Sequence, residues 1–490
     1  MLVALDKHVA SSSTSKTRST LVRILFFTVF AAVRFTCLSM DPPSWLSWSA
    51  GLYTDEGFYS LDARHQVLFH HAAPGNFHDS LLSPGLSAVQ QIVFGVFGPS
   101  DLCARALSVV LSLATILLLW LALRRSCGED AADIGACFLG LSPAAVFYNR
   151  MALQETPAVL FLVASLCARS YADEKSTTAK SLALEFACGV LAASVVLFKP
   201  LGLLALPALI MLGRTRGQRL QVLVSALGTL AVLLLWFVLH YLPNHSELAR
   251  MGQYYRLHQT LPATPRTLWL DIRRGFISTR SGLFPFLLST SPVVFGLALY
   301  NVWVGKTVKS PVNTVLLGWL LCGILYCMLM VYSPSRYYVL FLPALAGVAA
   351  IACSRCAPAL RIGLVALFCL VSVGWIFISF SQRAYTMAAA RLSMAHLLPS
   401  NGLLVGDVAP SLCMDSQIQA APMQPGLSND NHPLEKLNPD AIVLIRSKTW
   451  DDWWTDHYPG ILDPSQKLAG WTVGPGYRIE VFRVRRGETF

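Results

Sequence analysis

Two adjacent carboxylates, Asp55 and Glu56, have the residue types and the setting for acid–base chemistry. They lie in a polar stretch after the first apolar run and directly follow Thr54. Thr54 is a favourable N-cap residue, so we expect both carboxylates in the first turn of a helix, where negative charge is stabilised. Two interpretations follow. The pair either caps a solvated helix at the membrane surface, or it supplies a general base that accepts a proton from a hydroxyl group.

Three charged residues at the ends of later apolar runs could share a site with this pair. Glu155 precedes Thr156 and Pro157, a combination that marks the start of a helix. It is therefore either a second acidic residue of a site or part of the helix start. Lys199 and Arg336 lie in short turns between apolar runs. A cation in such a turn either binds a phosphate group or anchors its helix among lipid headgroups.

Histidines in the same polar stretch as Asp55 raise the question of a metal. His65 and His78 are the two candidates for a divalent-metal site, because imidazole and carboxylate groups together suit such ions. Their spacing is irregular, and the alternative is that they are polar residues of the membrane interface. The sequence therefore leaves open whether the protein binds a divalent metal, and it indicates no other cofactor.

The composition requires a membrane to hold these residues. Of the 490 residues, 54% are hydrophobic and only 13% are charged, and the mean hydropathy is +0.53. A soluble protein has about 25% charged residues. Apolar runs near the roughly 20 residues needed to cross a bilayer recur along the chain and predict about eleven transmembrane helices. They lie near 21–40, 100–123, 131–149, 155–171, 181–198, 200–213, 219–241, 283–303, 312–332, 337–353 and 361–381.

Basic residues between the runs predict the orientation of the chain. If the N-terminus is cytoplasmic, every inside break carries lysine or arginine, as the positive-inside rule requires. Among these residues are Arg23, Arg124, Arg125, Lys180 and Arg361. An odd number of spans then puts the C-terminus outside. The net charge of +11 is explained by this arrangement, and without a basic stripe interleaved with aromatic residues we expect no nucleic-acid partner.

Two units follow from this organisation. Residues 1–382 would form a transmembrane catalytic domain with two long outer loops, 41–99 and 242–282. Residues 383–490 would form a soluble α/β domain outside the cytoplasm. In that tail an amphipathic helix is expected over 385–398, with strands at Leu403–Val408, Asp440–Ile445 and Tyr477–Arg485.

Several motifs occur in a recognisable order along the first unit. They are Asp55-Glu56 before an aromatic residue and Ala63-Arg64, then Pro84-Gly-Leu86, Asp101-Leu-Cys-Ala-Arg105, Asn149-Arg150-Met-Ala-Leu-Gln-Glu155 and Arg336-Tyr337-Tyr-Val-Leu-Phe-Leu-Pro343. With these motifs in this order, the sequence resembles the GT-C glycosyltransferases related to protein O-mannosyltransferases and the lipid A aminoarabinose transferase.

This resemblance implies a polyprenyl- or dolichyl-phosphate sugar as donor and an acidic residue of the first outer loop as base. Asp55 matches that position, and Glu56 stands beside it. The resemblance also favours Arg336, together with Tyr337, as a ligand of the carrier phosphate, with Lys199 in a similar role.

The chain departs from the family pattern before Pro84. Relatives place a lysine or histidine there, whereas this sequence has Ser83. Arg64 or His78 could supply the missing cation. Arg150, which lies within a motif shared with the family, completes the set of candidate substrate-binding residues.

From these observations we predict a polytopic α-helical membrane protein of GT-C type, an inverting glycosyltransferase that transfers a lipid-phosphate-linked sugar to an acceptor hydroxyl on the extracytoplasmic face. The acceptor would be a glycan, a lipid or a protein, and the location the inner (plasma) membrane of a bacterium. Two alternatives share the architecture: a polymerase or ligase of lipid-linked glycans, and a membrane transporter or flippase. The sparse midspan polar residues argue against a transporter.

Overall fold

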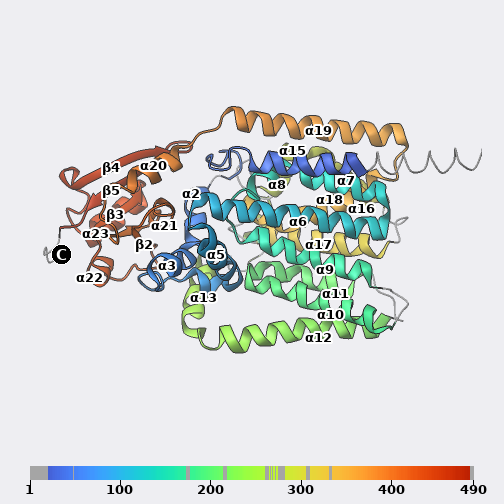
Figure 1. The fold of residues 1–490 in the computed structure, drawn as a ribbon, viewed down its shortest axis with the longest axis horizontal. Coiled ribbons are helices and arrows are strands. Elements are labelled where there is room, and N and C mark those ends of the chain that lie inside the picture. The colour runs from blue at the N-terminus through green and yellow to red at the C-terminus, as the bar shows by residue number, and fades with distance from the viewer. Residues whose placement is uncertain are drawn as a thin grey trace, which may run out of the picture.

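A long helical bundle and a smaller C-terminal sheet make up the protein (Figure 1). The computed structural model describes residues 20–485 except 48, 173–176, 213–217, 260–263, 265, 268, 271, 274–281, 305–309 and 330–333. Several topogenic residues, including those before residue 20, lie outside the described residues.

Each of the eleven predicted apolar runs contains helix. The bundle consists of residues 20–35, α6 (Asp101–Cys127), α7 (Glu129–Gly140) with α8 (Pro143–Tyr148), α9 (Glu155–Tyr171), α10 (Ala179–Ser194) with η1 (Val195–Leu197), η2 (Pro200–Ala205) with α11 (Leu206–Met211), α12 (Arg219–Trp236) with η4 (Phe237–Tyr241), α15 (Leu283–Thr290) with α16 (Pro292–Val304), α17 (Pro311–Leu329), η6 (Ser335–Phe341) with α18 (Leu342–Cys353), and α19 (Pro358–Ser381).

Not all of these helices are long enough to cross a membrane by themselves. Among the described residues, six helices have the length and apolarity of a span, or seven if α15 and α16, which are bent by 116°, count as one. Several runs are shortened by breaks, as at Pro143, because proline lacks the amide hydrogen that an unbroken helix needs. The number of eleven spans therefore stays a prediction.

The first long polar stretch folds into four short helices beside the C-terminal sheet (Figure 1). These are α2 (Gly51–Phe58), α3 (Leu61–Phe69), α4 (Asp79–Leu82) and α5 (Pro84–Phe97), and α13 (His245–Gln259) joins them from the second stretch. The prediction that Thr54 caps a helix is wrong. The helix α2 begins three residues earlier, where Ser49 Oγ accepts a hydrogen bond from Gly51 N, so Asp55 lies in mid-helix.

The C-terminal segment forms a five-stranded mixed sheet in the order β2-β1-β3-β5-β4. Strands β1, β2 and β3 pair in parallel, and β3, β5 and β4 pair antiparallel. The three predicted strands coincide with β1 (Leu403–Gly406), β3 (Ala441–Ile445) and β5 (Tyr477–Arg483), whereas β2 (Gln419–Ala421) and β4 (Lys467–Val473) were not expected. The accompanying helices are α20 (Thr386–Met394), α21 (Ala409–Leu412), α22 (Pro433–Leu437) and α23 (Lys448–His457).

Both faces of this sheet are covered, because alternate residues of a strand point to opposite sides. Ala441, Val443 and Ile445 of β3 belong to the same buried cluster as residues of α2 and the bundle. Ile442 and Leu444 pack on the other side with Trp454 of α23. The sheet is thereby fixed against the helices of the first polar stretch, and the position of those helices depends on it.

Candidate functional site

A cavity of about 640 Å³ opens where the bundle, the short helices and the C-terminal segment meet. A volume of this size is typical of a small-molecule site. Its lining comes from α2, the start of α9, the turn before η2, η6, α13 and the segment after β2. The residues used below are Asp55, Tyr59, Gln154, Lys199, Tyr254, Tyr255, Arg336, Tyr337, Gln424 and Leu427.

One end of the cavity carries two cations and two carboxylates. The Arg336 guanidinium forms an ion pair with the Asp55 carboxylate, and its Nε lies 3.9 Å from Glu155 Oε1. Lys199 Nζ lies 3.2 Å from the same Glu155 oxygen and donates a hydrogen bond to Gln154 Oε1. Glu155 is nearly fully buried, so it balances the two cations from within the protein.

These formal charges sum to zero, and burial acts on Asp55 in particular. Burial raises the pKa of the Asp55 carboxyl group above its usual value, while the positive charge of Arg336 opposes this rise. A carboxylate with a raised pKa is a better proton acceptor near neutral pH than an exposed one. The geometry therefore suits Asp55 to general-base chemistry beside a cation.

Tyr337 lies next to both cations. Lys199 Nζ is 4.8 Å and the Arg336 guanidinium carbon 5.4 Å from the centre of its ring. Such contacts are attractive because the ring face carries partial negative charge. They hold the two cations on one side of the cavity without neutralising them.

Much of the remaining cavity wall is aromatic and uncharged, and Tyr59 within it lies near Lys199, whose Nζ is 5.8 Å from the centre of the Tyr59 ring. Tyr59 of the α2–α3 turn, Tyr254 and Tyr255 of α13, and Leu427 of the C-terminal segment form this part of the wall. Gln424 Nε2 donates a hydrogen bond of 2.8 Å to the Tyr254 hydroxyl group, which joins the C-terminal wall to α13. Aromatic faces and amide groups of this kind suit an uncharged, hydroxyl-bearing ligand.

The structure thus brings together four residues selected from the sequence, Asp55, Lys199, Arg336 and Tyr337, with Glu155 in contact with two of them. It places Glu56 elsewhere. The Glu56 side chain is 2% exposed, receives two hydrogen bonds from Arg105 at 2.9 and 2.5 Å, and accepts a third from Ala152 N. Adjacent residues of a helix point in different directions, so only one of the two carboxylates reaches the cavity.

Two predicted arginines have structural partners. Arg64 is buried and donates from Nη2 to the carbonyl groups of Ser416 and Ile418, which fastens α3 to the C-terminal segment. Arg150 donates to Val33 and Cys37 carbonyl oxygens at the end of the first helix. Neither lines the cavity. The structure therefore does not support Arg64 as the cation that replaces the family's lysine or histidine, nor Arg150 as a substrate-binding residue.

The two metal candidates also have other partners. His65 Nε2 accepts a hydrogen bond from Ala420 N, and burial lowers the pKa of its ring to about 3. His78 Nδ1 lies 3.1 Å from Asp62 Oδ1, which raises the pKa of His78. Within the described part of the chain, no three residues among histidine, cysteine, aspartate and glutamate gather as a metal site.

Several lining residues had escaped the sequence analysis. Gln154 directly precedes Glu155 in one of the family motifs, so the selection of Glu155 could have drawn attention to Gln154. Tyr254, Tyr255 and Gln424 carry no local signal, because their position depends on how α13 and the C-terminal segment pack. These residues could be found only from the fold.

Comparison with known proteins agrees with the geometry. Residues 82–241 match the family described as dolichyl-phosphate-mannose-protein mannosyltransferase. No curated protein sequence gives a significant match.

Solved structures show the fold. ArnT from Cupriavidus metallidurans bound to undecaprenyl phosphate is 15% identical, with a TM-score of 0.63 over 96% of this chain and 99% of that one. The apo state of ArnT is 14% identical, with a TM-score of 0.65 over 95% of this chain and 98% of that one. The oligosaccharyltransferase AglB from Archaeoglobus fulgidus was solved in complex with an inhibitory peptide and a dolichol-phosphate. It is 13% identical, with a TM-score of 0.54 over 87% of this chain and 70% of that one. The resemblance drawn from the motifs is confirmed, and the comparisons agree with the expected enzyme class, a membrane glycosyltransferase with a lipid-linked donor.

The different surroundings of the two adjacent carboxylates lead to a first prediction. Glu56→Gln should lower the stability of the protein by about 3 kcal/mol, because the buried Arg105 loses its closest carboxylate and keeps only Asp101, which Arg391 also contacts. Asp55→Asn should change stability far less, since the cavity admits water to that group. Thermal unfolding of both variants in the same detergent measures the difference. Equal unfolding temperatures would show that the Glu56–Arg105 pair does not hold the fold.

Proposed function

We propose that this chain, whose fold is that of the GT-C glycosyltransferases, is an inverting glycosyltransferase that moves a sugar from a polyprenyl- or dolichyl-phosphate carrier to an acceptor hydroxyl group on the extracytoplasmic face of the membrane. The observation that carries the proposal is the cavity in which a half-buried carboxylate, Asp55, stands beside two cations, Lys199 and Arg336. A base and a phosphate site are the two groups that such a transfer needs.

The cationic end of the cavity would hold the carrier phosphate. A sugar linked to a lipid phosphate carries negative charge at the bridging group, and charge-assisted hydrogen bonds from arginine and lysine suit it. Two proteins of the same fold support this assignment, since ArnT was solved with undecaprenyl phosphate and AglB with a dolichol-phosphate. We assign the phosphate to Arg336 and Lys199, with Tyr337 beside them.

A narrow apolar cleft next to the cavity marks the direction in which the carrier's hydrocarbon chain would run. It shares three residues with the cavity, so it begins beside the cationic end. Its other lining residues are nearly all apolar and come from α9, η2, α17 and η6. The shared residues are Leu201, Tyr326 and Tyr337.

The proposed reaction needs no group from outside the cavity except its two substrates. The acceptor oxygen attacks the anomeric carbon while the bond from that carbon to the phosphate oxygen breaks, and its electron pair leaves with the lipid phosphate. Asp55 accepts the proton of the acceptor hydroxyl. Lys199 and Arg336 stabilise the negative charge that grows on the leaving phosphate, which is the kind of electrostatic stabilisation that contributes most in many enzymes.

Arg336 would have one partner before the donor binds and another afterwards. In the structure it pairs with Asp55, and an arriving phosphate would compete for its donors. Loss of that pairing leaves Asp55 in a buried position with less positive charge nearby, which further raises its affinity for a proton. Donor binding would therefore prepare the base for the acceptor. The candidate metal ligands His65 and His78 take no part in this proposal.

Substitution of the base tests the proposal. Asp55→Asn should lower turnover at least about a hundredfold, because the amide cannot accept a proton, and should leave donor affinity unchanged or slightly higher. The measurement is release of lipid phosphate from a panel of polyprenyl-phosphate sugars by purified protein in nanodiscs. In the wild type, activity should fall with decreasing pH through a midpoint above the usual aspartate range, since only the ionised carboxylate is a base.

The control for that experiment is Asp130→Asn, which removes a carboxylate that pairs with Arg361 far from the cavity. It should leave turnover within about twofold of wild type, as expected for an exposed ion pair. An active Asp55→Asn variant would remove Asp55 from the mechanism. An unreactive wild-type protein, with every donor of the panel and EDTA or metal added in turn, would contradict the proposed function itself.

A second experiment tests the phosphate assignment. Arg336→Ala should raise the apparent KM for the donor about tenfold or more, the equivalent of one charge-assisted hydrogen bond. Arg336→Lys should recover part of that loss, because it keeps the charge but not the paired donors. Arg361→Ala is the matched control, because Arg361 lies in the first turn of α19 and pairs with Asp130 instead of a cavity residue, and it should have no effect. An unchanged donor KM in Arg336→Ala would assign the phosphate to other residues.

The proposed sidedness can be tested separately. The positive-inside pattern places the N-terminus in the cytoplasm and residues 383–490 outside. Reporter fusions at residue 128, in the turn between α6 and α7, and after residue 382 should therefore report opposite sides of the membrane. The same side for both would reverse the assignment of the C-terminal sheet.

A further inference from the structure

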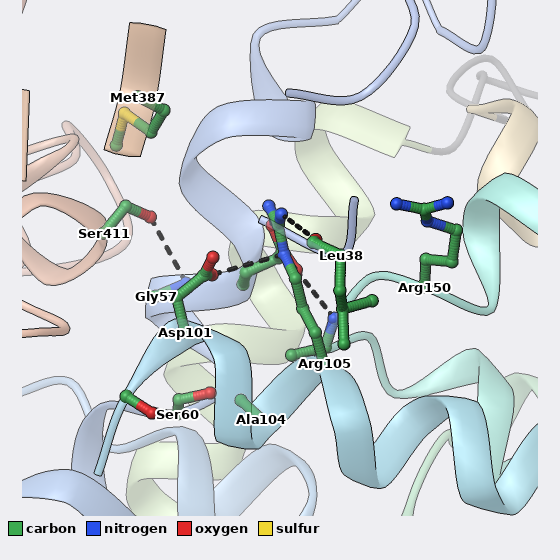
Figure 2. Close-up of polar contacts among 12 residues, drawn as sticks. Leu38, Gly57, Ser60, Asp101, Ala104, Arg105, Arg150, Met387 and Ser411 are labelled. Atoms are coloured by element: carbon green, nitrogen blue, oxygen red, sulfur yellow. Dashed lines mark hydrogen bonds and ion pairs between the residues drawn. The ribbon is translucent and has the colours of Figure 1, made fainter. Parts of the chain in front are cut away.

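The helix that carries Asp55 has only eight residues and is held from two sides by buried polar groups (Figure 2). A short helix has few internal hydrogen bonds to fix its position, so its neighbours must do so. One neighbour is α6 of the bundle. The other is α21 of the C-terminal segment, more than 350 positions further along the chain.

The contact with α6 uses side chains only. Arg105 binds both oxygens of Glu56 and also donates to the Met40 carbonyl group. Figure 2 shows its hydrogen bond to the Leu38 carbonyl group. Asp101 lies 3.3 Å from Arg105 Nε. These groups fix the position of Glu56, and through it one face of α2.

The contact with α21 reaches the backbone on either side of Asp55. The Ser411 hydroxyl group donates a hydrogen bond to Thr54 O at 3.0 Å. It accepts one from Gly57 N at 3.2 Å (Figure 2). Thr54 precedes Asp55 and Gly57 follows it by two residues. One fully buried hydroxyl group therefore ties the backbone before the carboxylate to the backbone after it.

The approach of the two segments is close enough to require glycine. A Cβ atom at Gly57 would lie 2.2 Å from Ser411 N and 2.5 Å from the Pro410 carbonyl carbon. Both are backbone atoms, which cannot rotate aside. The α2 backbone is thus packed directly on the peptide bond before Ser411.

The backbone of Ser411 is itself held in place by Arg391. Arg391 Nε donates to the Ser411 carbonyl oxygen at 2.9 Å, and Arg391 Nη1 lies 2.6 Å from Asp101 Oδ2. Asp101 in turn contacts Arg105, so the two supports of α2 are joined to each other. All of these side chains are at least nine-tenths buried.

We propose that Ser411 is a positioning residue for the base, acting on Asp55 through the backbone of Thr54 and Gly57. The inference rests on the proposed function of Asp55 but concerns a residue outside the cavity. Proton transfer depends on where the carboxylate stands relative to the acceptor oxygen, and displacements of about 1 Å are enough to slow catalysis. The C-terminal segment thereby sets the geometry of a base that it does not contain.

The first test is a comparison of rate and donor affinity. Ser411→Ala removes the hydroxyl group and almost no volume, and kcat should fall about fivefold while the donor KM stays within about twofold. Ser411→Cys keeps a weaker hydrogen-bonding group, so its kcat should lie between that of Ser411→Ala and that of the wild type. Ser393→Ala removes an exposed hydroxyl group of α20 and should match wild type. A Ser411→Ala protein with wild-type kcat, or with only its KM raised, would overturn the proposal.

A double-mutant cycle separates positioning from general support of the fold. If Ser411 acts through Asp55, then adding Ser411→Ala to Asp55→Asn should not lower the residual rate further. The same fivefold loss in both backgrounds would show that Ser411 acts independently of the base. Failure of the proposed function looks different, because then wild type itself releases no lipid phosphate from any donor of the panel. Gly57→Ala, which forces the two backbones apart, should reproduce the fall in kcat if it folds.

Discussion

Buried charges that must find partners from distant parts of the chain determine this structure. The Asp55–Arg336 ion pair joins residues 281 positions apart, and the Arg391–Asp101 pair joins the C-terminal segment to the first long bundle helix. An unpaired charge in a buried position is strongly destabilising. The short helices, the bundle and the sheet are therefore held in one arrangement in which these groups meet.

The same constraint shapes the cavity. Two carboxylates and two cations are kept near one another, and their charges balance before any ligand arrives. A phosphate that enters such a site finds donors already oriented, because packing against Tyr337 and the contact with Glu155 hold them. In the proposed reaction, the same contacts would prepare the cavity for an anion, which would take the place of Asp55 at Arg336.

Adjacent residues illustrate how far sequence reasoning extends. Asp55 and Glu56 are adjacent carboxylates, and their residue types and spacing do not show which of them reaches a cavity; only the family resemblance favoured Asp55. The tertiary structure separates them, since Arg105 binds Glu56 and Arg336 meets Asp55. Arg64 and His65 were selected for their type, yet both bind backbone groups of the C-terminal segment, a contact that depends on a segment far along the chain.

The sequence by itself determined the membrane class, the positions of the helical runs, three of the five strands and the family resemblance, because hydrophobic length, strand composition and motif order are local properties. It also selected Asp55 as one of two adjacent carboxylates in a polar stretch, and Lys199 and Arg336 as cations in short turns between apolar runs. Only the tertiary structure decided which of these share a cavity and that the C-terminal segment supports α2. Those outcomes depend on contacts between segments hundreds of residues apart, and such contacts follow from packing and from the pairing of buried charges.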